Sequence, residues 1–167
     1  PGASPSAFGA AGYTEVFYLN IGSDLGATSN AAIGAIHNTS YQNIPISITG
    51  GGSNLNSYTV LQDSGTYVQA ASNLNSILTR DEWLHLVKVH DRAANEVRFY
   101  VNNSLVLTTP FDPGAGTWSY VDRGDHLGSA GFDPYWAGGR QIRGVGYSYF
   151  AAYDGVFTVD DVAASYE

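Results

Sequence analysis

Cysteine and methionine are both absent from the 167 residues, and lysine occurs once, at Lys88. Without cysteine there is no disulfide framework and no thiolate metal site, so a bound metal would need oxygen or histidine ligands. No stretch approaches about 18 consecutive apolar residues, which argues against membrane insertion through a transmembrane helix. Because the chain opens at Pro1, we expect residue 1 to be a trimmed end.

Positive charge is scarce as well. Seven Lys and Arg residues stand against 15 Asp and Glu residues, which gives a formal net charge of -8. Such a field repels phosphate groups and therefore disfavours nucleic acid and anionic lipid surfaces as partners. The chain is instead rich in aromatic residues, with 12 Tyr, 7 Phe and 3 Trp, and 44% of its residues are hydrophobic. This content excludes intrinsic disorder and is enough for one folded domain with an ordinary core.

We expect a flexible N-terminal arm from Pro1 to Gly12 and one domain from residue 13 to residue 167. The domain begins with a β-prone run, Tyr13 to Ile21, in which apolar residues fall on both faces. Both faces of such a strand are expected to be covered, which predicts a central strand. Further short β-prone segments follow at residues 32–37, 44–49, 58–62 and 66–69.

The clearest alternation lies in residues 83–90, after a stretch at residues 72–82 that suits a loop or a helical turn. One face of this strand carries Trp83, His85, Val87 and Val89, and the other carries Leu84, Leu86, Lys88 and His90. A polar turn at residues 91–95 leads to a strand at 97–101. Asn102 and Asn103 then fit a tight hairpin turn, because asparagine tolerates positive φ, and a third antiparallel strand follows at 105–109.

The C-terminal segment predicts a strand at residues 147–153, a turn at Asp154 and Gly155, and a short helix. Thr158 suits the helix N-cap, and Asp160 and Asp161 suit its first turn. Val159, Val162 and Tyr166 share one side of that helix. Because nearly every other element is β, the predicted fold class is an all-β antiparallel jelly-roll sandwich with a short C-terminal helix.

Two segments carry a family resemblance. Residues 83–91, WLHLVKVHD, followed by residues 97–103, VRFYVNN, resemble the second half of laminin G-like domains, as does the ending from Gly146 to Tyr166. The resemblance covers about half of the chain. It implies the concanavalin A-like lectin and glucanase jelly roll, with Trp83 in the core beside Phe99 and Val101.

The resemblance does not by itself imply one function, because this fold carries lectins, adhesion modules, structural domains and glycan-cleaving enzymes. Two positions depart from the family pattern. Asn103 replaces the usual turn glycine, and Ser148 stands where an acidic residue is common in the last strand. The early strands are also too divergent to align with the family, and these departures together weaken the case for the family's calcium site.

Catalytic motifs are not evident. Glycoside hydrolysis on a jelly roll needs two carboxylates across the sugar, commonly arranged as E-x-D-x-E along one strand, and that motif is absent. Asp81 and Glu82 read as a turn at the start of a strand. His85 and His90 fall on opposite faces of their strand, so they do not coordinate one ion together. We therefore predict that the protein is not an enzyme.

The candidate ligand residues lie in the glycine- and aromatic-rich stretch between residues 114 and 146. Aromatic rings there suit stacking on sugar faces, and arginine forks suit hydroxyl, carboxylate or sulfate oxygens. The predicted ligand-binding residues are Trp118, Arg123, His126, Tyr135, Trp136 and Arg140. Calcium is the one cofactor considered, with Asp122, Asp125 and Asp133 as candidate oxygen ligands in loops. Core packing of these aromatics and turn formation by these aspartates are the alternative interpretations.

The leading hypothesis is a secreted, extracellular recognition and adhesion module that binds glycan or another surface component without catalysis. The alternative is a self-assembling structural subunit of an extracellular filament, sheath or surface layer. The small residues of Pro1 to Gly12 suit strand addition to a neighbouring copy, and the low lysine content leaves sheet edges less protected. A polysaccharide lyase or hydrolase is a third, weaker interpretation.

Overall fold

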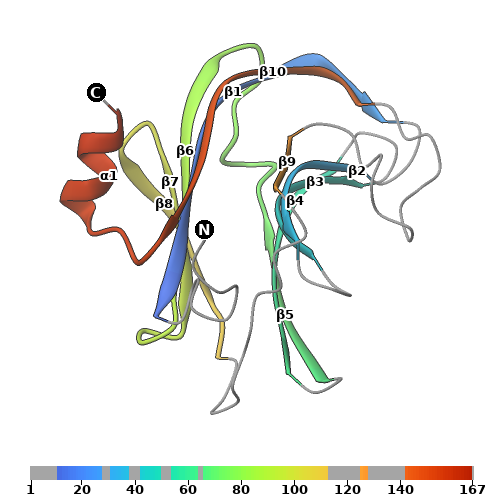
Figure 1. Ribbon diagram of the computed structural model, residues 1–167. Helices are drawn as coiled ribbons and strands as arrows, with labels where there is room; N and C mark the ends of the chain where they lie inside the picture. The colour runs from blue at the N-terminus through green and yellow to red at the C-terminus, as the bar shows by residue number, and fades with distance from the viewer. Residues whose placement is uncertain are drawn as a thin grey trace, which may run out of the picture.

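A computed structural model describes residues 11–27, 31–37, 42–49, 54–63, 66–112, 125–127 and 142–166. These residues form ten strands and one helix (Figure 1). The strands are β1 (Gly12–Ala27), β2 (Ala31–His37), β3 (Gln42–Thr49), β4 (Asn54–Asp63), β5 (Thr66–Asn73), β6 (Trp83–Asp91), β7 (Glu96–Val101), β8 (Ser104–Pro110), β9 (Asp125–Leu127) and β10 (Ile142–Asp154). The helix is α1 (Val159–Tyr166).

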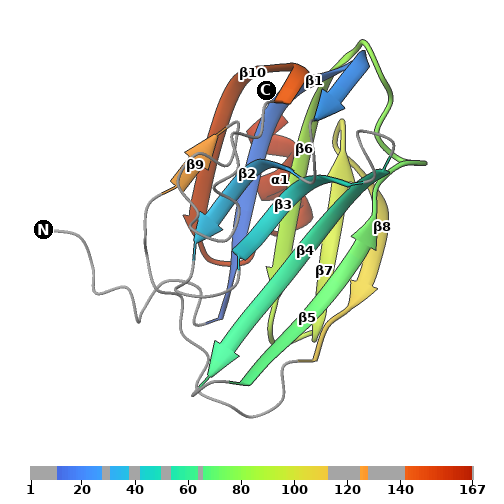
Figure 2. The same ribbon diagram turned by 90° about the vertical axis from the view of Figure 1, so that its right-hand side faces the viewer.

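The strands build two five-stranded antiparallel sheets. The first sheet has the order β10-β1-β6-β7-β8, and the second has the order β5-β4-β3-β2-β9. The two sheets face each other, and α1 lies on the outer face of the first sheet, away from the second (Figure 1). Figure 2 shows the second sheet in front of the first. The predicted all-β sandwich with a short C-terminal helix is confirmed.

β1 is a central strand, as predicted, because it pairs with β10 on one side and with β6 on the other. Tyr13, Phe17 and Leu19 point into the space between the sheets, whereas Val16 points to the outer face beneath α1. The second sheet covers one face of the strand and the helix covers the other. This double cover explains why apolar residues occupy both faces of β1.

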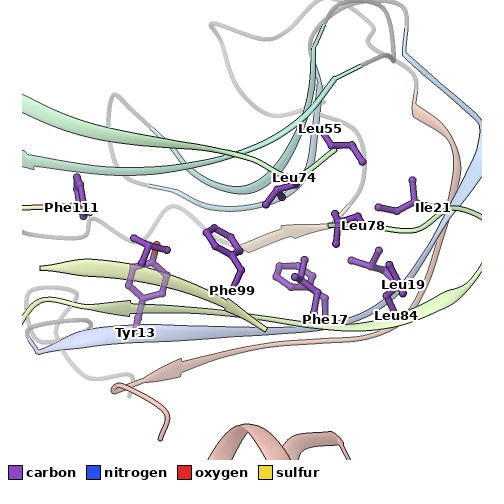
Figure 3. Close-up of a cluster of buried hydrophobic side chains, with 12 residues drawn as sticks. Tyr13, Phe17, Leu19, Ile21, Leu55, Leu74, Leu78, Leu84, Phe99 and Phe111 are labelled. Carbon is purple, nitrogen blue, oxygen red and sulfur yellow. The ribbon is translucent and has the colours of Figure 1, made fainter. Parts of the chain in front are cut away.

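The main core lies between the sheets and is nearly free of solvent. Side chains of the first sheet meet Leu55 of β4 and Leu74 and Leu78 of the β5–β6 connection (Figure 3). The connection is held in place because Leu74 N–H donates to the Leu55 carbonyl at 2.9 Å. The cluster comprises Tyr13, Phe17, Leu19, Ile21, Leu55, Leu74, Leu78, Leu84, Leu86, Val97, Phe99 and Phe111.

The β5–β6 connection contains the turn predicted near residues 72–82, although β5 runs on to Asn73. Leu78 N–H donates to the Leu74 carbonyl at 3.1 Å, which closes one helical turn. The connection is then joined to β1 at Asp81, which has a φ of 62°. Its N–H donates to the Ile21 carbonyl, and its carboxylate accepts from Ser23 N–H, both at 2.8 Å. Asp81 therefore serves as a turn residue, as its position in the sequence predicts.

The β7–β8 hairpin also follows the sequence prediction. Asn102 and Asn103 both adopt positive φ, at 48° and 64°, as a two-residue primed turn requires. Asn102 also joins this turn to β6, because its N–H donates to the His85 carbonyl at 2.9 Å and its Oδ1 accepts from His85 N–H at 3.0 Å. The turn is thereby fixed beside the first residues of β6.

α1 begins with the predicted N-cap. Asp161 N–H donates to Thr158 Oγ1 at 3.2 Å, and Asp161 Oδ2 accepts from Thr158 N–H at 2.8 Å, which forms a capping box with aspartate in the usual place of glutamate. Val162 is fully buried on the outer face of the first sheet, whereas Val159 and Tyr166 are exposed. Of the three residues predicted to form the apolar side of the helix, only Val162 is buried. Within the described ranges, no helix has the length and apolarity needed to cross a membrane.

The prediction that Trp83 belongs to the core is wrong. Trp83 is 55% exposed, and it lies on the outer face of the first sheet. Phe99 lies on the opposite face, since it pairs with Lys88 of β6 and packs between the sheets. Tryptophan at the start of β6 falls beyond the region that α1 covers, which is why burial expected from the family pattern does not occur here.

Replacing Asn103 tests the turn. Asn103→Val is expected to lower the free energy of unfolding by about 1–2 kcal/mol, because a β-branched residue is strained at positive φ. Asn103→Gly should leave stability unchanged or raise it by a few tenths of a kcal/mol. Urea unfolding monitored by fluorescence measures both. Ala93→Val is the matched control, because Ala93 lies in the turn between β6 and β7 and does not have a positive φ. An equal loss for the two valine variants would contradict the assignment.

Candidate functional site

Most of the predicted ligand residues lie outside the described residues: Trp118, Asp122, Arg123, Asp133, Tyr135, Trp136 and Arg140. Asp125 and His126 belong to β9, where the backbone of Asp125 pairs with Ile36 and that of His126 with Ala35. No group of three or more histidine and acidic side chains able to hold a metal occurs in the described part of the chain. The described residues instead offer two other groups with functional potential.

The first group is ionisable and lies between the sheets. Glu15 of β1 and Lys88 of β6 are directly opposite each other in the sheet, and both are fully buried. Lys88 Nζ lies 3.6 Å from Glu15 Oε2 and 5.9 Å from the centre of the Tyr13 ring. Burial lowers the pKa of Lys88, and the Glu15 carboxylate opposes that shift. The pair is an ion pair inside the sandwich.

His90 extends this group toward the end of β6. Its ring centre lies 5.2 Å from that of Tyr13 and 5.2 Å from that of Phe111, so aromatic rings flank it on both sides. Burial lowers the pKa of His90 to about 3, and the positive charges of Lys88 and Arg92 add to the shift. The imidazole is therefore neutral at neutral pH.

This buried group does not present an active site. Glu15, Lys88 and His90 have no exposed surface, so a substrate has no route to them in this conformation. A general acid or base must lie within hydrogen-bond reach of its substrate. The group instead constrains the structure, because a buried charge is costly wherever its counter-ion is missing.

The second group lies on the outer face of the first sheet. The registers of β1 with β6 and of β1 with β10 place side chains in rows that run across three strands. Val162 of α1 packs on the rows of valines in the middle of this face. The rows, written in the order β6–β1–β10, are Trp83–Asn20–Gly146, His85–Tyr18–Tyr149, Val87–Val16–Ala151 and Val89–Thr14–Tyr153.

The C-terminal end of α1 is attached at the second row. Tyr18 Oη donates to the Tyr166 carbonyl at 2.7 Å, and Ser165 Oγ is hydrogen-bonded to His85 Nε2 at 3.2 Å. The His85 ring centre lies 5.0 Å from that of Tyr18 and 5.4 Å from that of Tyr166. Burial lowers the pKa of His85, which favours the neutral ring in this contact.

The first row lies beyond the end of the helix, and Trp83 is exposed there. Its six-membered ring lies against Gly146 of β10, where a Cβ atom would come within 3.4 Å of Trp83 Cη2. Asn20, half-buried, occupies β1 between these two residues. The indole is therefore supported by the sheet beneath it and open to solvent.

Three tyrosines extend the exposed aromatic surface around α1. Tyr166 at the helix end is 44% exposed, and Tyr149 and Tyr153 of β10 are 45% and 37% exposed. The two β10 hydroxyls are hydrogen-bonded at 2.8 Å, which raises the pKa of Tyr153. Trp83, Tyr149, Tyr153 and Tyr166 together are called the outer aromatic face. Exposed rings gathered on one face are typical of interaction sites.

Acidic side chains surround the Trp83 end of this face. Asp81 and Glu82 directly precede Trp83, and both are exposed, as is Asp24 near the end of the buried part of β1. The hydrogen bond from Ser23 N–H lowers the pKa of Asp81, so this carboxylate stays ionised. Arg80 is the cationic residue of the same turn. The local balance is negative, like that of the whole chain.

The sequence contained a signal for this surface that pattern reading missed. The predicted helix has eight residues, which span about 12 Å at 1.5 Å per residue, whereas residues 83–89 of a strand span about 20 Å. A helix of that length does not cover every outward-facing residue of β6. Trp83 is the first residue of β6, so the length of the helix predicts that this side chain is not covered by α1.

Comparisons with known proteins bear on the fold. No protein-family model matches the chain, and no curated protein matches it significantly. Solved structures do match. The chain is similar to the receptor-binding domain of botulinum neurotoxin C/D mosaic serotype, with a TM-score of 0.64 and 14% sequence identity over 98% of this chain and 37% of that chain.

A second similar structure is the botulinum neurotoxin serotype D ligand-binding domain in complex with N-acetylneuraminic acid. Its TM-score is 0.59 and its identity 15%, over 93% of this chain and 36% of that chain. The chain therefore spans little more than a third of these structures. Likeness at this level of identity shows a shared β-sandwich fold, and these matched proteins are receptor- or ligand-binding domains.

The buried ion pair can be tested by removing one partner. Lys88→Met is expected to lower the free energy of unfolding by about 3–5 kcal/mol, because it deprives the buried Glu15 carboxylate of its cation. Glu15→Leu combined with Lys88→Met should recover most of that loss. Arg98→Met is the control, since Arg98 pairs with Asp91 at 3.0 Å but is partly exposed and should cost about 1 kcal/mol or less. Equal losses for Lys88→Met and Arg98→Met in urea unfolding would contradict a buried pair.

The buried His90 predicts a pH dependence of stability. Its pKa is about 3 in the folded protein and about 6.5 unfolded, so the unfolded chain binds more protons between these values and stability falls as pH falls. Between pH 7 and pH 4.5 this residue should account for about 2–3 kcal/mol. His90→Phe should reduce the loss measured by urea unfolding at the two pH values. An unchanged difference between wild type and variant at both pH values would show that His90 does not titrate in this way.

Proposed function

We propose that the chain is a non-catalytic, laminin G-like module that acts outside the cell and recognises glycan or another surface component through surface aromatic rings and arginines. The observation that carries this proposal is the outer aromatic face, where four large rings remain exposed beside a short helix. The core residues of this protein are well buried, so these four exposed rings stand out. Leaving apolar surface in contact with water is unfavourable, and gathered exposed rings mark a surface that binds a partner. The receptor-binding and ligand-binding domains of similar fold support the same interpretation.

The absence of catalysis in this proposal has two supports. Glu15, Lys88 and His90, the ionisable residues clustered in the interior, are fully buried. The sequence also lacks the E-x-D-x-E arrangement expected of a jelly-roll glycosidase. The arginines and aromatic residues that the sequence predicts as ligands between residues 118 and 140 remain part of the proposed recognition surface.

Calcium also remains part of the proposal. Asp122, Asp125 and Asp133 are its proposed ligands, and Asp125 is the one that falls in the described part of the chain, at the start of β9. Asp125 was expected in a loop and lies in a strand instead. Carboxylates are suitable oxygen ligands for this ion, which needs six or more oxygen atoms. A calcium ion there would organise the loops that carry the predicted ligand residues.

The structural subunit remains the second candidate, and one observation favours it. β8 is the edge strand of the first sheet, and its Leu105 and Val106 are 54% and 37% exposed. An apolar edge strand is a template for pairing with another chain, particularly where lysine is scarce.

Binding to a glycan array, repeated with calcium and with EDTA, tests the proposal. We expect wild type to bind at least one glycan, and Trp136→Ala, in the predicted ligand loop, to bind it at least tenfold more weakly. EDTA should weaken binding if calcium organises the loops. The arrays should include sialylated, sulfated and neutral glycans at physiological salt.

Two results would contradict the proposal, and a third would locate the contact of the alternative. Absence of binding to every glycan, together with concentration-dependent oligomers in sedimentation velocity, would favour the structural subunit. Oligomers that disappear on deletion of residues 1–12 would point to the N-terminal arm as the assembling strand. Turnover of any polysaccharide would replace both candidates with an enzyme.

A further inference from the structure

We propose that Trp83 is the centre of a binding site for uncharged glycan, with Tyr166, Asn20 and the Asn102–Asn103 turn around it. This inference rests on the proposed recognition function and adds both a location and a ligand class. It places this site on the outer face of the first sheet, beside the C-terminal end of α1, in addition to the predicted ligand residues between 118 and 140.

Trp83 has the properties of a stacking platform. The ring is 55% exposed, and its six-membered part lies against the glycine backbone of Gly146. Support from below keeps a ring in one orientation, so little conformational freedom is lost when a ligand covers its other face. The C–H face of a pyranose is apolar and flat enough to stack on such a ring.

Polar groups suited to sugar hydroxyls lie on both sides of this platform. Asn20 is next to Trp83 in the same row of the sheet, and its amide supplies a donor and an acceptor. The Asn102–Asn103 turn is held beside His85, two residues along β6, and both of its asparagines are exposed. Tyr166, 44% exposed, closes the helix side of the site.

The charge of the site selects the ligand class. Asp81 and Glu82 precede Trp83 directly and are exposed, and Asp81 is kept ionised by Ser23 N–H. The whole chain carries a formal charge of -8. Negative charge fixed one and two residues before Trp83, on a chain that is acidic overall, repels sialic acid, uronic acid and sulfate groups. The expected ligand is therefore a neutral oligosaccharide.

The test compares three variants on one set of probes. Cellohexaose, xylohexaose and mannohexaose serve as neutral probes, and sialyllactose and heparin oligosaccharides as anionic ones. We expect wild type to bind a neutral probe more tightly than either anionic probe in isothermal titration calorimetry. Trp83→Ala should raise the dissociation constant at least tenfold, whereas Val159→Ala, 59% exposed at the opposite end of α1 from Tyr166, should leave it unchanged.

Trp83→Phe is the conservative variant that distinguishes loss of the ring from a folding defect. It keeps an aromatic ring against Gly146 and should retain part of the affinity. Circular dichroism and thermal unfolding establish that each variant is folded. In ¹H–¹⁵N spectra of wild type, the indole signal of Trp83, assigned with Trp83→Phe, should shift on addition of the neutral probe. The indole signals of Trp118 and Trp136 show in the same spectra whether the probe also contacts the predicted ligand residues between 118 and 140.

The outcomes distinguish failure of this inference from failure of the proposed function. Neutral-probe binding lost in Trp83→Ala supports both. Binding that survives in Trp83→Ala and is lost in Trp136→Ala overturns the Trp83 site and leaves the recognition function in place. Preference for sialyllactose or heparin overturns the ligand class assigned here. Binding to none of the probes or array glycans overturns the inference together with the proposed function.

Discussion

The pairing of β1 with β6 is the constraint on which the rest of this structure depends. It runs without interruption from Gly12 opposite Asp91 to Asn20 opposite Trp83. A slip of one residue would turn every side chain of one strand to the other face of the sheet. Glu15 would then lie under α1, with Lys88 left in the interior without its counter-ion. The buried ion pair therefore penalises the wrong register, while the valines beneath α1 and the aromatic rings between the sheets favour the right one.

Alternation and turn chemistry were enough to predict the strands of the first sheet and its β6–β7–β8 unit, but not the order in which β10 and β1 join that unit. The β6–β7–β8 unit and the Thr158 cap follow from residues a few positions apart, because strand period, positive φ and N-capping are local properties. The sequence also predicts that the outer face of β1 is covered, because the residues on that face include the apolar Val16 and Tyr18. The pairing of Glu15 with Lys88 was not predicted, although the lone lysine stands among apolar residues of β6 and needs a counter-ion if it is buried. Its partner depends on register with a strand about 70 residues away, which alternation does not define.

The position of Trp83 could not be read from the same pattern. A large aromatic residue that shares a strand face with Val87 and Val89 is normally buried with them. Burial on this face, however, depends on where a separate helix ends, and α1 is attached at Tyr18 and His85. The next row along the strands, Trp83–Asn20–Gly146, lies beyond the end of α1, so the Trp83 side chain is exposed to solvent. Family resemblance therefore predicted the strand correctly but not the environment of its first residue.

The exposure of one tryptophan also limits how tightly a ligand can be held. Complete cover of the 55% of Trp83 that is open would contribute at most about 3 kcal/mol, taking about 250 Å² for the side chain at about 25 cal/mol per Å². A millimolar dissociation constant already corresponds to about 4 kcal/mol, and ordering a flexible oligosaccharide opposes binding. Trp83 therefore supports weak binding and needs the neighbouring amides and Tyr166 to reach even that range. Tight attachment to a surface would then come from several such contacts made at once, because linked weak sites gain affinity through effective concentration.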